Sequence, residues 1–143
     1  MRSKRLHSEH DRVFVLVLEP GEEAVSSILS FAAQEKLAGA RLSAVGAFSD
    51  AVLGYFERER KDYKRNRVTE QVEVASLAGT IALQEGKPRL HAHVVLGRPD
   101  GSALAGHLLE AHVWPTLEIV LVDSPSALER SKDPETGLAL LVP

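Results

Sequence analysis

The chain has 143 residues, of which 44% are hydrophobic and 26% are charged, a balance that is ordinary for one globular domain with its own core. The formal net charge of −3 and the sequence pI near 6.1 exclude a molecule-wide cationic field, so binding to nucleic acid or anionic lipid would need a local basic patch. The absence of cysteine excludes disulfides, thiolate nucleophiles and cysteine-ligated zinc, which leaves histidine and carboxylate side chains as metal ligands.

Residues 1–11 are polar and predict a flexible N-terminal segment ahead of one domain spanning residues 12–143. No fixed-period repeat or low-complexity linker divides that domain, and no apolar run reaches the roughly 18 residues of a membrane-spanning helix. We therefore expect a single cytoplasmic domain that makes no membrane contact.

Residues 12–18, RVFVLVL, form a nearly continuous apolar run, which predicts a core strand that is buried on both faces or lies in the middle of a sheet. Glu22 and Glu23 stand where a helix start favours acidic side chains, and apolar residues then recur at the helical period. Gly39 is the expected C-terminal cap. The pattern predicts one clear helix that packs an apolar stripe on a sheet.

Short apolar or alternating runs bounded by turn residues predict several strands after the helix. The expected strands are residues 42–48, 51–56, 68–75, 77–83, the two histidine-bearing runs between Pro88 and Trp114, and residues 117–122. A turn at Ser49-Asp50 separates the first two, and the tail predicts a one-turn helix from Ser124 to Arg130 and a strand within 134–142. The result is an α+β fold, a mainly antiparallel β-sheet with one principal helix packed on it.

Residues 57–67 carry six basic and three acidic side chains and are too polar for a core strand. Clustered basic side chains can contact phosphates, whereas interleaved acids are typical of a solvated hairpin tip, which is the simpler interpretation. The candidate phosphate contacts are Arg58, Arg60, Lys61, Lys64, Arg65 and Arg67.

Two histidines stand on one predicted strand. Because alternate side chains of a strand share a face, His91 and His93 present two imidazoles side by side. The turn signal at 97–101 leads to a run that begins with Gly106-His107, so pairing of the two runs brings His107 toward the first two. Three neutral imidazoles can hold a divalent metal, zinc first, and leave a fourth position open. The alternative is strand histidines that bond to backbone or water.

Three further residues are candidates to support this site. His112 follows His107 by five positions, so an unbroken strand points it to the opposite face, and a bulge near Gly106 would change that parity. Glu85 and Glu110 are candidate ligands or general bases, although solvent-facing positions are the favoured interpretation of both.

Four segments in this order resemble the plants-and-prokaryotes conserved domain family, called PPC: residues 46–56, residues 73–81, His91-Ala92-His93-Val94 and residues 106–110. The resemblance covers most of the chain from Arg12 onward. It implies a homotrimer with an antiparallel sheet and flanking helix, a metal bound by His91, His93 and His107, and a DNA-binding or regulatory role ascribed to prokaryotic members from their plant relatives. In a trimer, Trp114 is the expected interface anchor.

Two departures from the family pattern bear on that role. Ala105-Gly106-His107 stands where the family commonly has Gly-Gly-His, and no AT-hook of the plant type precedes the domain in this sequence. The tripeptide Gly97-Arg98-Pro99 matches an AT-hook core, but Asp100-Gly101 follows it and apolar strands flank it, so it is predicted to be a turn.

The family fold is also similar to that of acetolactate decarboxylase, a zinc enzyme with a comparable histidine arrangement. Two functions therefore stay open. One is a trimeric metal-binding protein with a DNA-associated or regulatory role. The other is a metal-dependent enzyme acting on a small carbonyl or carboxylate compound, with Glu85, Glu110 or His112 as acid or base.

Overall fold

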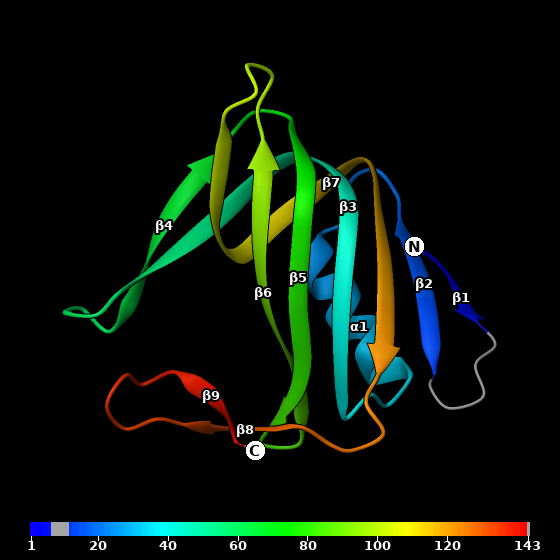
Figure 1. The fold of residues 1–143 in the computed structure, drawn as a ribbon, viewed down its shortest axis with the longest axis vertical. Coiled ribbons are helices and arrows are strands. Elements are labelled where there is room, and N and C mark those ends of the chain that lie inside the picture. The colour runs from blue at the N-terminus through cyan, green and yellow to red at the C-terminus, as the bar shows by residue number, and fades with distance from the viewer. Residues whose placement is uncertain (7–11, 143) are drawn as a thin grey trace.

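The structure, a computed structural model, describes residues 1–6 and 12–142. Within these residues nine strands form one sheet and a single helix packs on it, which confirms the predicted α+β class (Figure 1). The elements are β1 (Arg2–Leu6), β2 (Val13–Leu18), α1 (Ala24–Gln34), β3 (Gly39–Glu57), β4 (Asp62–Val68), β5 (Val72–Gln84), β6 (Lys87–Gly97), β7 (Ala103–Asp123), β8 (Glu129–Lys132) and β9 (Ala139–Val142). Strand pairing is antiparallel throughout these elements except for the short contact of β5 with β8.

Part of the predicted flexible segment is a strand. β1 pairs antiparallel with β2, from Arg2 opposite Val17 to Leu6 opposite Val13. The rest of that segment, residues 7–11, lies outside the described residues. The domain boundary at residue 12 therefore stays a prediction.

The two longest strands, β3 and β7, bend and give the sheet its shape. β3 has 19 residues and β7 has 21, and they pair along most of their length. β5 pairs with β3 on one side and with β6 on the other, and β6 pairs in turn with the start of β7. The pairings β3–β5–β6–β7–β3 close a circuit, which brings the start of β7 beside β6 (Figure 1).

The predicted turn at Ser49-Asp50 is wrong, because β3 continues through it. Gly46 has a φ of +149°, and the register against β7 shifts on both sides of Phe48, so bulges bend the strand without ending it. A side chain at Gly46 would collide with the carbonyl oxygen of Thr116 on β7. The two strands predicted at 42–48 and 51–56 are therefore one. In the same way, the strand predicted at residues 117–122 is not separate, because it continues the second histidine run within β7.

The turn predicted at residues 97–101 joins β6 to β7. The backbone N–H of Arg98 donates to the Ser102 carbonyl, and the N–H of Gly101 donates to the Arg98 carbonyl. Gly101 has a φ of +81°, which glycine adopts without a steric penalty. The AT-hook lookalike at 97–99 is therefore part of a closed hairpin turn.

The helix start is as predicted and its end is not. The Glu23 carboxylate accepts hydrogen bonds from two backbone N–H groups of the first turn of α1, and so caps it. The helix ends at Gln34 and Lys36 takes a left-handed φ of +54°. Gly39 is the first residue of β3, so its predicted capping role is wrong.

The predicted helix between Ser124 and Arg130 is also wrong. The backbone N–H groups of Ser124 and Leu128 donate to the carbonyls of Gly39 and Ala38, so the segment lies along the start of β3 and closes no helical turn. It leads into an antiparallel hairpin of β8 and β9, which crosses the lower end of the sheet in Figure 1. β9 confirms the strand predicted in the tail.

One face of the sheet is covered by α1. Ile28 and Phe31 of the helix are buried, and the Phe31 ring meets Phe14 of β2 edge to face with centroids 5.2 Å apart. Burial of side chains of this size stabilises a fold by about 1.5–3 kcal/mol each. This packing holds β2 and the helix together, and it fixes which side chains of the sheet face the core.

In the part of the chain that the structure describes, the opposite face of the sheet carries no helix. β2 lies between β1 and β7 in the sheet, which confirms one of its two predicted placements. It alternates, with Phe14, Leu16 and Leu18 buried and the valines between them partly exposed, so it is not buried on both faces. On the same helix-free face, Val120 of β7 is 45% exposed, and Val45 of β3 is 54% exposed. No helix in the described residues is long and apolar enough to cross a membrane.

Candidate metal site

The register of the sheet brings three histidines together. His91 and His93 lie on β6, and Ala92 between them is buried, so both imidazoles leave the sheet on the helix-free face. His107 of β7 lies directly opposite His93. Thr80 of β5 lies opposite His91 on the other side of β6. The three histidines that the sequence singled out therefore converge, because β7 bends back to pair with β6.

The geometry of the three side chains fits a metal ion. Their ligand nitrogens all lie within 4.8 Å of one another, and the Nε2 atoms of His91 and His93 are 3.2 Å apart. Two nitrogens bound tetrahedrally to zinc, with bonds of about 2.0–2.1 Å, are about 3.3 Å apart. The ring centroids are separated by 5.2 to 5.5 Å. Three imidazoles in this arrangement can share one ion.

The surroundings favour the neutral form of His91 and His107, which is the form that binds metal. Burial lowers the pKa of His107 to about 4, and the charges of the neighbouring histidines and Arg130 act in the same direction. Burial, Arg130 and His93 also lower the pKa of His91. Nδ1 of His107 is buried with no hydrogen-bond partner among the described residues. An unpartnered buried nitrogen costs free energy, so it is a fitting ligand for a cation.

Tyr63 of β4 closes the site on one side. Its ring stacks on His107, with centroids 4.8 Å apart and 29° between the planes. Gly54 of β3, which is the register partner of His107, makes room for this ring. A Cβ atom at Gly54 would lie 2.7 Å from Cδ1 of Tyr63, which is a clash. β3, β4 and β7 together hold the His107 imidazole in place.

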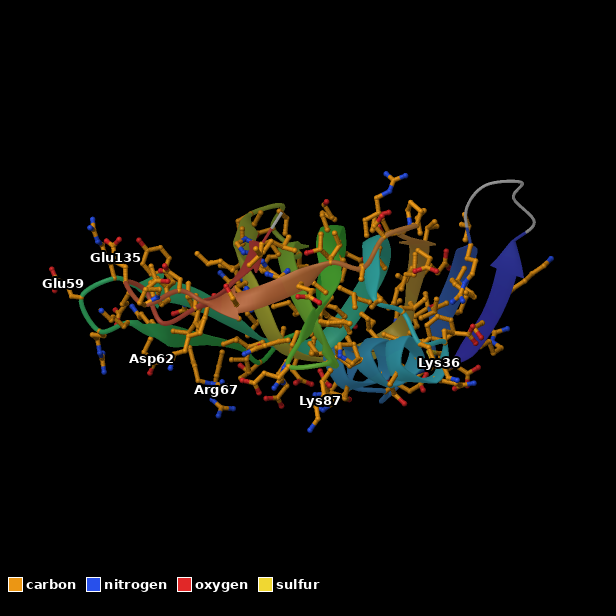
Figure 2. All side chains as sticks on the ribbon, turned by 90° about the horizontal axis from the view of Figure 1, so that it is seen from below. Lys36, Glu59, Asp62, Arg67, Lys87 and Glu135 are labelled. Carbon is orange, nitrogen blue, oxygen red and sulfur yellow. The ribbon has the colours of Figure 1, made fainter. Side chains whose placement is uncertain are left out.

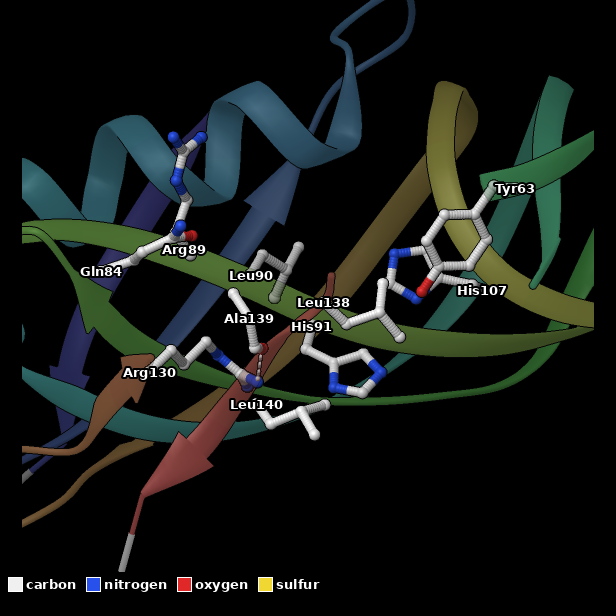
Figure 3. A pocket seen from close by; sticks show the side chains of 10 residues that line it. All are labelled: Tyr63, Gln84, Arg89, Leu90, His91, His107, Arg130, Leu138, Ala139 and Leu140. Carbon is white, nitrogen blue, oxygen red and sulfur yellow. Dashed lines mark hydrogen bonds between the residues drawn. The ribbon is translucent and has the colours of Figure 1, made fainter. Parts of the chain in front are cut away.

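A cavity of about 250 Å³ opens beside His91 and His107, between β6 and the C-terminal hairpin of β8 and β9 (Figure 3). Its lining residues are Tyr63, Gln84, Arg89, Leu90, His91, His107, Arg130, Leu138, Ala139 and Leu140. Arg130 and Leu140 approach from the hairpin, whereas His107 and Tyr63 stand at the opposite end of the cavity in Figure 3. A small molecule in this space would contact the histidine cluster directly.

The sequence profile of the Plants and Prokaryotes Conserved (PCC) domain matches residues 5–125. The chain belongs to this family. The resemblance read from the four sequence segments is thereby confirmed. The match includes all three histidines and ends before β8, so the C-terminal hairpin lies beyond it.

Solved structures of relatives share the fold over nearly the whole chain. A metal-containing protein from Archaeoglobus fulgidus is 33% identical, covers 100% of this chain and 99% of its own, and has a TM-score of 0.85. A plant- and prokaryote-conserved (PPC) protein from Pyrococcus horikoshii is 32% identical, covers 96% and 98%, and has a TM-score of 0.87. A "putative DNA binding protein" from Bacteroides thetaiotaomicron is 26% identical, covers 98% and 96%, and has a TM-score of 0.89.

The predicted similarity to the acetolactate decarboxylase fold is also confirmed, at the level of the fold alone. A Staphylococcus aureus protein of unknown function similar to alpha-acetolactate decarboxylase has a TM-score of 0.57 at 12% identity, over 78% of this chain and 52% of its own. No curated protein sequence matches the chain significantly.

The three other candidate residues of this family member lie outside the histidine cluster. Nδ1 of His112 is 2.8 Å from Oδ1 of Asp50. The Glu110 carboxylate lies 3.6 Å from the guanidinium of Arg65. Glu85 is exposed in the turn between β5 and β6, with a φ of +52°. None of the three belongs to the group whose ligand atoms lie within 4.8 Å of one another.

The basic run forms the exposed tip and outer strand of the β3–β4 hairpin. Figure 2 shows Glu59, Asp62 and Arg67 at one end of the molecule, far from Lys36 beside α1. All six candidate phosphate contacts are exposed, and three of them lie near carboxylates. The pairs are Arg60–Glu57 at 3.3 Å, Arg58–Glu135 at 3.8 Å and Arg65–Glu110 at 3.6 Å. The tip is therefore of mixed charge, as the sequence predicted.

Sequence reasoning assigned no role at the metal site to Tyr63 or Arg130. Arg130 reaches Thr80, which lies 50 positions earlier in the chain, and no local pattern marks such a contact. Tyr63 is the one aromatic side chain in the polar run 57–67. An aromatic side chain in an otherwise solvated hairpin indicates that the hairpin packs against another part of the fold, and here the Tyr63 ring packs on His107.

Proposed function

We propose that this protein binds a divalent transition-metal ion, zinc being the first candidate, through His91, His93 and His107. The observation that carries the proposal is the convergence of three ligand nitrogens within 4.8 Å, in surroundings that favour neutral imidazole. The metal-containing relative from Archaeoglobus fulgidus supports it. Imidazole ligands suit zinc, copper, nickel and iron, whereas magnesium and calcium prefer oxygen ligands.

The metal would bind a small ligand. Three protein ligands leave a coordination position open, and the cavity beside His91 and His107 gives a small molecule access to it. When bound, the metal would supply Lewis acidity to an oxygen atom of that ligand. The stacked Tyr63 ring holds His107 in place, and the C-terminal hairpin walls off the cavity on one side.

The test is metal analysis of protein that has been stripped with a chelator and dialysed against zinc, nickel or cobalt. We expect about one ion per chain, and a visible absorption band of histidine-bound Co²⁺ in the cobalt form. Circular dichroism before and after stripping shows whether the protein stays folded. A folded chain that takes up none of these ions would overturn the proposal.

We also propose that the protein is a cytoplasmic homotrimer. Exposed apolar side chains support the assembly, because Val45, Val120 and Trp114 are 54%, 45% and 51% exposed in the single chain. Light scattering should give about 47 kDa, which is three times the chain mass of 15.6 kDa. A mass of one chain at micromolar concentration would contradict the trimer.

Association with DNA in a regulatory role is a second candidate. The relative from Bacteroides thetaiotaomicron described as a "putative DNA binding protein" favours it. Lys61, Lys64 and Arg67 are exposed, with no carboxylate within 4.0 Å among the described residues. Three copies of such a patch in a trimer would strengthen weak phosphate contacts.

Fluorescence anisotropy with duplex DNA at two salt concentrations tests this candidate. If the hairpin binds phosphate, replacement of Lys61, Lys64 and Arg67 by glutamine weakens binding and flattens its salt dependence. The matched control replaces three exposed lysines elsewhere, Lys36, Lys87 and Lys132, with the same change in charge. No binding at low salt, or equal loss in both variants, would remove the hairpin as a DNA contact.

A metal-dependent reaction on a small carbonyl or carboxylate compound is the other candidate at the same site, and the cavity favours it. Glu85, Glu110 and His112 lie outside the cluster, so none of them is assigned as acid or base. Release of CO₂ from a 2-hydroxy-3-oxo acid by the metal-loaded protein, and its loss in His93→Ala, would establish a decarboxylase-like activity. Absence of release from the fully loaded protein would count against it.

A further inference from the structure

Arg130 of β8 is the one buried charged side chain among the described residues, with 9% of its surface exposed. Its guanidinium donates from Nη2 to Oγ1 of Thr80 at 2.9 Å and from Nη1 to the Ala139 carbonyl at 3.2 Å. Both acceptors are neutral. Nε is buried with no hydrogen-bond partner among the residues described, and no carboxylate there lies within 4.0 Å of the guanidinium. A buried charge without a counter-ion is costly.

The position of Arg130 shows what could balance that charge. Thr80, which holds Nη2, is the register partner of His91, so the guanidinium is anchored beside the histidine cluster. Arg130 lines the same cavity as His91 and His107, and Figure 3 shows it at the hairpin end of that cavity. The cluster and the arginine therefore face one small volume from two sides.

The charged groups that would border this cavity are all positive. Three neutral imidazoles would leave a bound divalent ion with its full charge of 2+, and Arg130 adds another positive charge. Among the described residues, no acidic side chain lines the cavity. An anion is the ligand that such a site favours, since it offsets both charges at once.

The walls of the cavity narrow the class of anion. Leu90, Leu138 and Leu140 give it an apolar lining, which suits a short carbon chain. The arginine fork matches the two oxygens of a carboxylate. The remaining polar side chains of the cavity are those of Tyr63, Gln84 and Arg89, so inorganic phosphate is the competing anion against which the carboxylate is tested.

We propose that Arg130 is the anion-binding residue of the His91–His93–His107 site, and that its ligand is a short carboxylic acid with a second oxygen atom next to the carboxylate. The carboxylate pairs with Arg130, and the second oxygen reaches the metal position. The inference rests on the proposed metal site. It adds the substrate class and a residue from a hairpin beyond the family match.

The test uses the full-length protein loaded with zinc and isothermal titration calorimetry with lactate, its neutral isostere lactamide, and inorganic phosphate. We expect lactate to bind about tenfold or more tightly than lactamide, and phosphate to bind more weakly than lactate. Arg130→Gln should lose about tenfold or more in lactate affinity, and Arg130→Lys should recover part of it. The matched control, Arg67→Gln, removes an exposed arginine that does not line the cavity and should change affinity far less.

Metal content separates this inference from the metal proposal. If the wild-type chain does not load metal, the proposed metal site itself fails. If it loads metal and binds lactate no better than lactamide, or binds phosphate more tightly than lactate, only the carboxylate inference fails. If Arg130→Gln retains its metal and binds lactate with wild-type affinity, Arg130 is not the anion-binding residue. Should that variant not fold, the lactate–lactamide ratio and Arg130→Lys still decide.

Discussion

Two histidines on the same strand, β7, have opposite electrostatic surroundings. His107 is partly buried under the Tyr63 ring beside two other imidazoles, and burial lowers its pKa to about 4. His112, five residues further on, is more exposed, and its hydrogen bond to Asp50 raises its pKa. The same hydrogen bond lowers the pKa of Asp50. The first histidine is suited to bind a metal as a neutral ligand, whereas the second is suited to carry a charge opposite a carboxylate.

Removal of one cluster histidine should have the largest effect. His93→Ala deletes one of three ligands, so zinc affinity falls by about a hundredfold or more. The metal content after dialysis drops from about one ion per chain to near zero. His112→Ala, which deletes a histidine of the same strand, should keep the full content. Equal loss of metal in both variants would show that the cluster histidine is no more important for metal binding than His112.

Proton titration measures the difference between the pKa values of His107 and His112 directly. In metal-free protein followed by NMR, the His107 ring should titrate with a midpoint of about 4 and the His112 ring with a midpoint above the ordinary 6.5. Midpoints that coincide, or that lie in the reverse order, would contradict the lowered pKa of His107 and the raised pKa of His112.

The same shifts predict opposite contributions to stability. Between pH 6.5 and about 4 the unfolded chain binds a proton at residue 107 that the folded chain does not, so His107 makes the metal-free protein less stable as pH falls through this window. His112 has a raised pKa, so its contribution is fully present below pH 6.5 and is lost as pH rises through its folded pKa. Thermal unfolding of His107→Gln and His112→Gln across this range separates the two.

Removal of the Tyr63 ring should reduce the difference between the pKa values of His107 and His112. Tyr63→Ala exposes His107 to water, and because burial is the main cause of its low pKa, the midpoint should rise from about 4 toward 6.5. Tyr63→Phe keeps the ring and should leave the midpoint low. The His112 midpoint serves as the internal control, and an unchanged His107 midpoint in Tyr63→Ala would show that the ring does not set it.

The smallest effect is expected at the exposed pair. Asp50→Asn removes the carboxylate that raises the pKa of His112, so that pKa should fall toward 6.5. The loss of unfolding free energy at pH 6 should stay below about 1 kcal/mol, since the pair is solvent-exposed and screened by water. Urea unfolding and NMR measure the two changes. A shift of the His107 midpoint in the same variant would mean that the two regions are coupled.

The histidine cluster could be predicted from the sequence because its signal is local. The two-residue spacing of His91 and His93 sets a common face, and the turn at 97–101 sets the return of His107. The helix start was likewise marked by Glu23, which caps its own first turn. These features depend on residues within one strand pair or one helical turn.

The remaining features depend on contacts between distant segments. The continuity of β3 through Ser49-Asp50 is set by its bulged pairing with β7, which no local pattern shows. The tail from Ser124 is held along β3 by backbone hydrogen bonds, so its local helix signal was overridden. Arg130 reached the cavity only because that tail forms a hairpin. The continuity of β3, the course of the tail and the position of Arg130 all depend on pairing between segments that are distant in the sequence.

The histidines of the cluster are held by the main-chain ladder itself, since His93 and His107 are paired residues of β6 and β7 and Thr80 of β5 lies opposite His91. These strands belong to a sheet whose core is built of apolar side chains. Binding of the proposed metal would therefore order few new groups, in contrast to small zinc domains whose folding is the binding event. Such an ion would exchange while the chain stays folded, so its occupancy would follow the free metal concentration. Such a site can be loaded, emptied and compared in both states in the same protein preparation.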